Sequence, residues 1–259
     1  MKPSNTAPSH SSVLKEHTAF RFLLPAAFWL AVWWGIALWV DMELLVPTPL
    51  CVIKTLGALA VTVGFWQTAG ISLLRIFCGT LSGILLGTAL AVLTDRFRIA
   101  DCILSPAIRI IRTVPVASFI ILVLLWVKTG QVPGVISALI VLPILWENVT
   151  AGLKAVDPLL LEMCNAYRLG RLKKLRFLYL PALRPCFSSG VCSAIGLAWK
   201  SGVAAEVLCL PKQAIGTQVY FSKIYLETPA LFAWTGVVIL LSLLLETLVK
   251  KLLKGGIHA

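Results

Sequence analysis

The chain has 259 residues, of which 59% are hydrophobic and only 13% are charged. A soluble domain carries about 25% charged residues, so these charges are too few to coat a water-exposed surface. The apolar residues also form long blocks, and composition therefore predicts a membrane protein. The formal net charge of +12 could indicate nucleic-acid binding, but the basic residues lie in short gaps between apolar blocks. A nucleic-acid interface needs a hydrophilic basic face, so we expect no nucleic-acid partner and a lipid bilayer instead.

Six apolar spans can be drawn along the chain with a window of about 20 residues. They cover residues 22–40, 69–94, 104–127, 132–150, 185–208 and 230–250. Residues 1–20 are polar and are expected to be a disordered cytoplasmic N-terminus, and the first span is expected to be retained rather than cleaved. Residues 21–254 then form one all-α membrane domain with six transmembrane helices, followed by a short tail at 255–259.

Lysine and arginine alternate in abundance from one gap to the next. The N-terminus, the gap after the second span, the gap after the fourth span and the C-terminus are rich in them, and the other gaps are poor. Cytoplasmic loops carry the excess of basic residues, so both termini are expected in the cytoplasm. An even number of spans requires the same result.

Several spans contain glycine or proline at positions that affect helix packing or shape. Gly79, Gly83 and Gly87 repeat at a spacing of four residues, which lets helix backbones approach closely. We expect this ladder to pack within the chain rather than to form a dimer seam. Pro106 and Pro115 in the third span and Pro143 in the fourth are expected to bend their helices.

Metal and cofactor chemistry finds no support in the residue pattern. The chain has seven cysteines without a Cys-x-x-Cys pair, and its three histidines, His10, His17 and His258, lie near the termini. We therefore expect no metal site and no cofactor.

The basic loop at about 154–182 is the most informative stretch. Asp157 followed by Pro158 predicts a helix start, and Gly170 is expected to end that helix. A basic stretch and Leu180-Pro181 then lead into the fifth span. From physics alone, an amphipathic helix lying on anionic headgroups explains the loop as well as a specific contact does.

This loop resembles the cytoplasmic loop of type I ATP-binding cassette (ABC) importer permeases. The family pattern is Glu-Ala-Ala, three residues, Gly, nine residues, then Ile-x-Leu-Pro. Anchoring the pattern on Leu180-Pro181 places the glutamate on Glu162, the isoleucine on Leu178 and the glycine on Arg168, which departs from the pattern. The resemblance therefore implies a coupling loop made of Glu162, Met163, Cys164, Arg168, Gly170, Leu180 and Pro181.

Other stretches are similar to the branch that imports sulfonates, taurine, nitrate or bicarbonate. They lie at 45–49, 72–79, 113–119, 142–148 and 197–206. The resemblance implies a permease in the bacterial plasma membrane that works with an ATP-binding subunit, a second permease copy, expected to form a homodimer, and an extracytoplasmic solute-binding protein. It also implies a cytoplasmic coupling helix and transport of a small, anionic solute by alternating access.

The chain itself is not expected to be an enzyme, because it contains no Gly-x-x-x-x-Gly-Lys-[Ser/Thr] phosphate loop. Two other functions remain as alternatives. A membrane-embedded enzyme would need a catalytic set, yet no histidine lies in a span. An ion-coupled secondary carrier would usually show two homologous halves, and no internal repeat is evident.

Charged residues within the spans are candidate contacts for a solute. Arg75 and Glu147 lie near span ends, where snorkelling to the headgroups explains them. Lys200 is deeper, and six residues from Glu206 it does not share a helix face with that carboxylate. We therefore predict that Lys200 lines a translocation path and favours anions, with Trp199 and Glu206 as neighbouring candidates.

Overall fold

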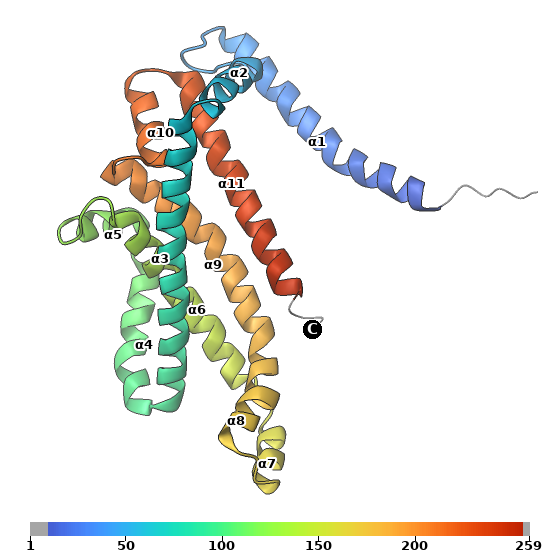
Figure 1. The fold of residues 1–259 in the computed structure, drawn as a ribbon, viewed down its shortest axis with the longest axis vertical. Helices are drawn as coiled ribbons and strands as arrows, with labels where there is room; N and C mark the ends of the chain where they lie inside the picture. Colours follow the sequence, from blue (N-terminus) through green and yellow to red (C-terminus); the bar gives the residue numbers. More distant parts are fainter. Residues whose placement is uncertain (1–9, 256–259) are drawn as a thin grey trace, which may run out of the picture.

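The computed structural model describes the backbone of residues 10–255 and the side chains of residues 24–253. Only helices occur in this described part (Figure 1). In chain order they are α1 (His10–Val40), α2 (Pro49–Ala60), α3 (Val63–Arg96), α4 (Arg98–Thr113), α5 (Val116–Leu124), α6 (Val132–Lys154), α7 (Pro158–Ala166), α8 (Arg171–Lys174), the π-helix η1 (Leu175–Tyr179), α9 (Leu180–Cys209), α10 (Ile215–Ile224) and α11 (Thr228–Gly255).

Four of these segments are long and apolar enough to cross a membrane. They are Val63–Arg96, Val132–Lys154, Arg171–Cys209 and Thr228–Leu253. The pair α4 and α5 would make a fifth crossing if the two bent helices count as one. The apolar part of α1, Leu24–Val40, is shorter than these segments. The described residues therefore support a helical membrane protein with four to five such crossings.

The predicted third span, 104–127, is not one helix. It breaks between α4 and α5, which are bent by 107°. Pro115 accounts for the end of α4, because a proline disfavours the helical region for the residue before it. Val114 accordingly adopts φ −74° and ψ 132°, an extended conformation that ends α4. The proline signal was present in the sequence, but it breaks the span where only a bend was expected.

The glycine ladder of α3 packs against α6, as predicted. A Cβ atom added at Gly79 would lie 2.0 Å from the carbonyl oxygen of Gly134. At Gly83 the carbonyl oxygen of Ala138 would lie at 2.7 Å, and at Gly87 that of Leu142 at 2.6 Å. Because the opposing atoms are backbone, the two helices can approach this closely only where the side chain is a hydrogen atom.

The third long helix, α9, packs beside α3 and α6 and completes the core. One buried cluster joins α3, α4, α6 and α9, and a second joins α3, α9, α10 and α11. Helices α7 and α8 lie at one end of the molecule, together with the turn between α3 and α4, while α2 and α10 lie at the opposite end (Figure 1). Helix α1 extends away from this bundle (Figure 1).

Several boundaries differ from the predicted ones. Helix α1 begins at His10, inside the segment 1–20 that was expected to be disordered, and residues 1–9 lie outside the described residues. Of the expected tail at 255–259, Gly255 ends α11 and the rest lies outside the described residues. Helices α2 and α10 were not predicted. A signal for α2 exists in Thr48-Pro49, since Thr48 caps the helix and Pro49 occupies its first turn.

Candidate functional site

Helix α7 starts where the sequence predicts. The side chain of Asp157 accepts a hydrogen bond from the backbone N–H of Leu159 at 2.9 Å, and Pro158 occupies the first turn. An aspartate cap satisfies an otherwise free N–H, and proline there loses no hydrogen bond because its position has no partner inside the helix. Two adjacent residues therefore fix the start of this helix without help from the rest of the chain.

The end of α7 is set by Arg168 rather than by Gly170. Arg168 has φ 49°, the left-handed conformation that glycine adopts most easily. Its N–H bonds to the carbonyl of Asn165 at 2.9 Å, and the N–H of Leu169 bonds to the carbonyl of Cys164 at 3.0 Å. This pair of bonds is a Schellman motif. Gly170 instead precedes α8 with φ −62°. The residue aligned with the family glycine thus keeps the glycine-like backbone.

The side chains of α7 divide into an exposed face and one buried contact. Glu162 and Met163 are exposed, whereas Cys164 is buried. Apolar side chains in and after α7 are exposed as well, namely Leu159, Tyr167, Leu172 and Phe177. An exposed apolar surface of this kind marks a contact with a protein or with a membrane.

The loop returns to the bundle through a continuous helix. Residues from α8 through η1 to α9 form one apolar segment, Arg171–Cys209. Within it, Leu178 is buried, while Leu180 and Pro181 are exposed. The π-helix η1 ends at Tyr179, two residues before Pro181, whose missing N–H removes one helical hydrogen bond. The loop and α9 are therefore joined without an intervening coil.

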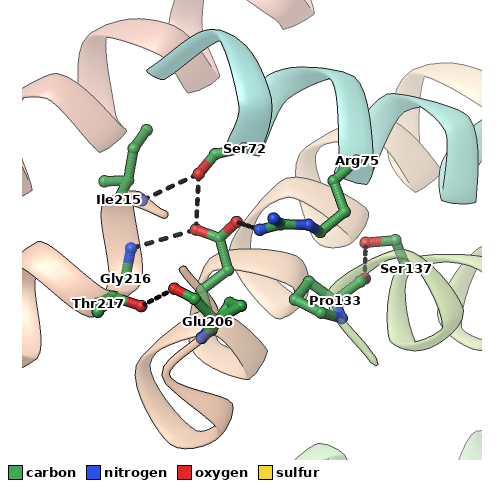
Figure 2. Close-up of polar contacts among 9 residues, drawn as sticks. Ser72, Arg75, Pro133, Ser137, Glu206, Ile215, Gly216 and Thr217 are labelled. Atoms are coloured by element: carbon green, nitrogen blue, oxygen red, sulfur yellow. Dashed lines mark hydrogen bonds and ion pairs between the residues drawn. The ribbon is translucent and has the colours of Figure 1, made fainter. Parts of the chain in front are cut away.

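A buried polar network lies near the opposite end of α9 (Figure 2). Glu206 is fully buried and accepts from Arg75 Nη1 at 3.0 Å, from Ser72 Oγ at 2.9 Å and from the N–H of Gly216 at 3.1 Å. The N–H of Ile215 in turn donates to Ser72 Oγ at 2.9 Å. These four contacts join α3, α9 and α10.

The network also explains why α10 begins where it does. The preceding residue, Ala214, offers no side-chain cap, so the first N–H groups of the helix need other acceptors. Ser72 and Glu206 supply them from two different helices. The carboxylate also lies at the positive end of the α10 dipole. Gly216 allows the approach, since a Cβ there would lie 2.5 Å from Cβ of Glu206.

The three residues predicted for a translocation path fall in different environments. Trp199 is buried, and its indole Nε1 donates to the carbonyl of Val238 in α11 at 3.0 Å. Glu206 is buried in the network, so neither side chain is open to a solute in this conformation. Lys200 is exposed. Of the three, only Lys200 has an exposed side chain.

Arg75 and Glu147 each have an ion-pair partner that the sequence did not suggest. Arg75 pairs with Glu206, and its side chain is only 16% exposed. Glu147 in α6 pairs with Arg112 in α4, across the predicted third and fourth spans. Both partners lie far away in sequence, so helix-face reasoning along one span could not identify them.

Several known permeases are similar to this chain. The taurine transport system permease protein TauC of Escherichia coli strain K12 is 27% identical over 226 residues, covering 84% of this chain and 81% of the relative. The putative aliphatic sulfonates transport permease protein SsuC of Bacillus subtilis strain 168 is 26% identical, covering 82% and 76%. The nitrate import permease protein NrtB of Leptolyngbya laminosa is 31% identical over 147 residues, covering 56% and 52%.

The fold is also similar to a solved structure. The inward-facing MetNI methionine ABC transporter, in its CY5 native crystal form, matches with a TM-score of 0.57 at 18% identity, covering 74% of this chain and 94% of that chain. The family model described as "binding-protein-dependent transport system inner membrane component" matches residues 83–255, from the glycine ladder to the end of α11. The resemblance drawn from the loop is therefore confirmed, and the chain belongs to the family of binding-protein-dependent transport system inner membrane components.

Proposed function

We propose that this chain is the membrane-spanning subunit through which an ABC importer moves a small anionic solute across the bacterial plasma membrane by alternating access. The observation that carries the proposal is α7. It is a short, self-capped helix with Glu162 exposed, and it leads through a continuous helix into the bundle. A transporter that couples two states needs such a rigid connection between its energy source and its spans.

In this proposal, the loop at about 154–182 is the coupling loop and α7 its coupling helix. Exposed Glu162 and Met163 contact an ATP-binding subunit, while buried Cys164 faces the chain itself. Arg168 and Gly170 shape the turn after α7, and Leu180 and Pro181 link it to α9. ATP hydrolysis belongs to the partner, because the sequence has no phosphate loop of the Walker type.

The membrane arrangement follows from the same proposal. Six crossings are formed by α1, α3, the broken pair α4 and α5, α6, α9 and α11, within a permease domain of residues 21–254. The basic end with α7 lies in the cytoplasm, as do both termini. Two copies of the chain pair as a homodimer, and an extracytoplasmic solute-binding protein delivers the solute from the other side.

The class of solute is inferred from the relatives. Their names specify taurine, aliphatic sulfonates, nitrate and bicarbonate. These solutes share an oxyanion group, which arginine and lysine recognise well. An anionic solute is also consistent with exposed Lys200 on the path, which remains a prediction of this proposal.

The coupling role can be tested on Glu162. We expect Glu162→Ala to reduce, and Glu162→Lys to abolish, co-purification of the ATP-binding subunit with the permease, because the exposed carboxylate lies in the proposed contact. Glu227→Lys is the matched control, since Glu227 is exposed between α10 and α11, and α10 lies at the opposite end of the molecule from α7 (Figure 1). Equal recovery of the ATP-binding subunit with all three variants would refute the coupling role.

A further inference from the structure

An open cleft lies between α4 and α6 and has a volume of about 450 Å³. Its lining combines apolar and basic residues. The nine residues are Ile108, Arg109, Arg112, Pro143, Trp146, Glu147, Thr150, Ala151 and Lys154. The cleft is separate from the Glu206 network and from the α7 surface, so the proposed function has not used it.

The charges of the cleft are unbalanced. Arg109, Arg112 and Lys154 are basic, and Glu147 is the one acidic residue of the lining. Glu147 pairs with Arg112. Among the described residues, Arg109 and Lys154 form no ion pair and no side-chain hydrogen bond. Two positive charges therefore face the cleft without a counter-charge.

The cleft reaches the buried core of the helix bundle. Ile108 and Trp146 belong to the buried cluster that joins α3, α4, α6 and α9. Trp146 is anchored there by its Nε1, which donates to Thr94 Oγ1 at 3.0 Å. Lys154, by contrast, is the last residue of α6. Ionisable side chains on spanning helices are costly and usually line a polar path.

The lining also offers an unused neutral group. Thr150 Oγ1 is buried and has no hydrogen-bond partner among the described residues. Other hydroxyls of these helices, such as that of Ser137, bond to a carbonyl one turn earlier. A buried hydroxyl without a partner is uncommon in proteins. It adds a donor beside two unpaired cations.

We propose that this cleft is a binding site for the oxyanion group of a small solute on its way through the permease, a proposal that rests on the proposed function. Arg109 and Lys154 attract the anion, and the planar guanidinium of Arg109 binds two of its oxygens. Arg112 is held back by Glu147. Because that pair is more than half exposed, an arriving anion can compete with the carboxylate for Arg112 at low cost.

The test measures binding without transport. The permease is purified with its ATP-binding subunit in detergent, without the solute-binding protein, and methanesulfonate binding is measured by equilibrium dialysis at low salt. Arg109→Gln and Lys154→Gln should each weaken binding by about three- to tenfold, because each removes an unpaired cation. Glu147→Gln should strengthen binding by a similar factor, since it frees Arg112. Lys128→Gln, outside the cleft, should leave binding unchanged.

The variants are expected to change the affinity for methanesulfonate in opposite directions. Misfolding cannot produce this pattern, since a damaged protein would not bind the anion more tightly. Equal binding in all five proteins, wild type included, would overturn the site. A lipid phosphate shares the chemistry of the solute, so the same complexes are compared by native mass spectrometry. Loss of bound phospholipid from Arg109→Gln and Lys154→Gln, with no displacement by methanesulfonate, would assign the cleft to lipid headgroups and overturn the solute site. Continued anion uptake would then show that only this inference failed.

Discussion

Glu206 is fully buried within the bundle, and three different donors surround its carboxylate. A buried charge is tolerated only when it is paired and hydrogen-bonded, which Arg75 and Ser72 achieve here. The ion pair therefore fixes the relative position of α3, α9 and α10. In this conformation the carboxylate bonds to donors from within the chain.

Breaking this ion pair should cost more than removing it completely. Arg75→Met or Glu206→Met leaves one uncompensated buried charge and should lower the free energy of unfolding by about 3–5 kcal/mol. The double variant should lose less stability than either single variant, because neither charge remains uncompensated. Denaturant unfolding in detergent measures the free energy of unfolding of the two single variants and the double variant.

The exposed pair Arg112–Glu147 provides the control for this comparison of single and double variants. Its side chains are 62% and 54% exposed, so solvent screens the attraction. Replacing Arg112 and Glu147 by Met, singly and together, should give a coupling free energy between the two substitutions below about 1 kcal/mol. Coupling energies of equal size in the two pairs would contradict the role assigned to burial.

Arg168 carries a backbone conformation that suits glycine better. The left-handed region costs a residue with a Cβ roughly 1 kcal/mol or more. Arg168→Gly should therefore slow hydrogen exchange of the Leu169 amide, which closes the Schellman motif, by about fivefold. Arg168→Ala, which removes the guanidinium but keeps the Cβ, should not slow it. Similar exchange in both variants would show that the turn is not strained.

At the scale of helices, the contact between α3 and α6 depends on glycine. Gly79→Ala would force a Cβ against the backbone of Gly134 and should destabilise the protein by about 3 kcal/mol. Gly70→Ala, in the same helix, is the control, because no atom lies within 4 Å of its added Cβ. Gly70→Ala should be neutral or slightly stabilising, since alanine favours helices. Thermal unfolding in detergent compares them, and equal midpoints would refute close packing.

The same scale shows which helices can be read from sequence. The start of α7 is encoded by adjacent residues, Asp157 and Pro158, and was predicted. The start of α10 is capped by Ser72 and Glu206, which are distant in sequence, so no local signal marks it. The ion pairs of Arg75 and Glu147 were missed for this reason, although the residues themselves had been singled out. Short-range chemistry was predictable, and long-range pairing was not.

At the scale of the whole molecule, the apolar blocks and the family were predictable, but the course of the third span was not. The apolar composition indicates membrane helices, because lipid cannot hydrogen-bond to the backbone N–H and C=O groups, and a helix pairs these groups internally. The loop pattern around Glu162 and Pro181 indicated the family. The 107° bend depends on how α5 packs on α6 and α9, which Pro115 permits but does not dictate.

The central claim is that this chain forms the path of an ATP-driven importer and couples through α7. The most direct measurement is uptake of a labelled anion, such as nitrate or taurine, into proteoliposomes containing the permease and its ATP-binding subunit, with the solute-binding protein outside and ATP inside. We predict uptake that requires ATP and all three proteins and that Glu162→Lys abolishes. Uptake that proceeds without ATP or without the ATP-binding subunit, driven by an ion gradient, would contradict the account.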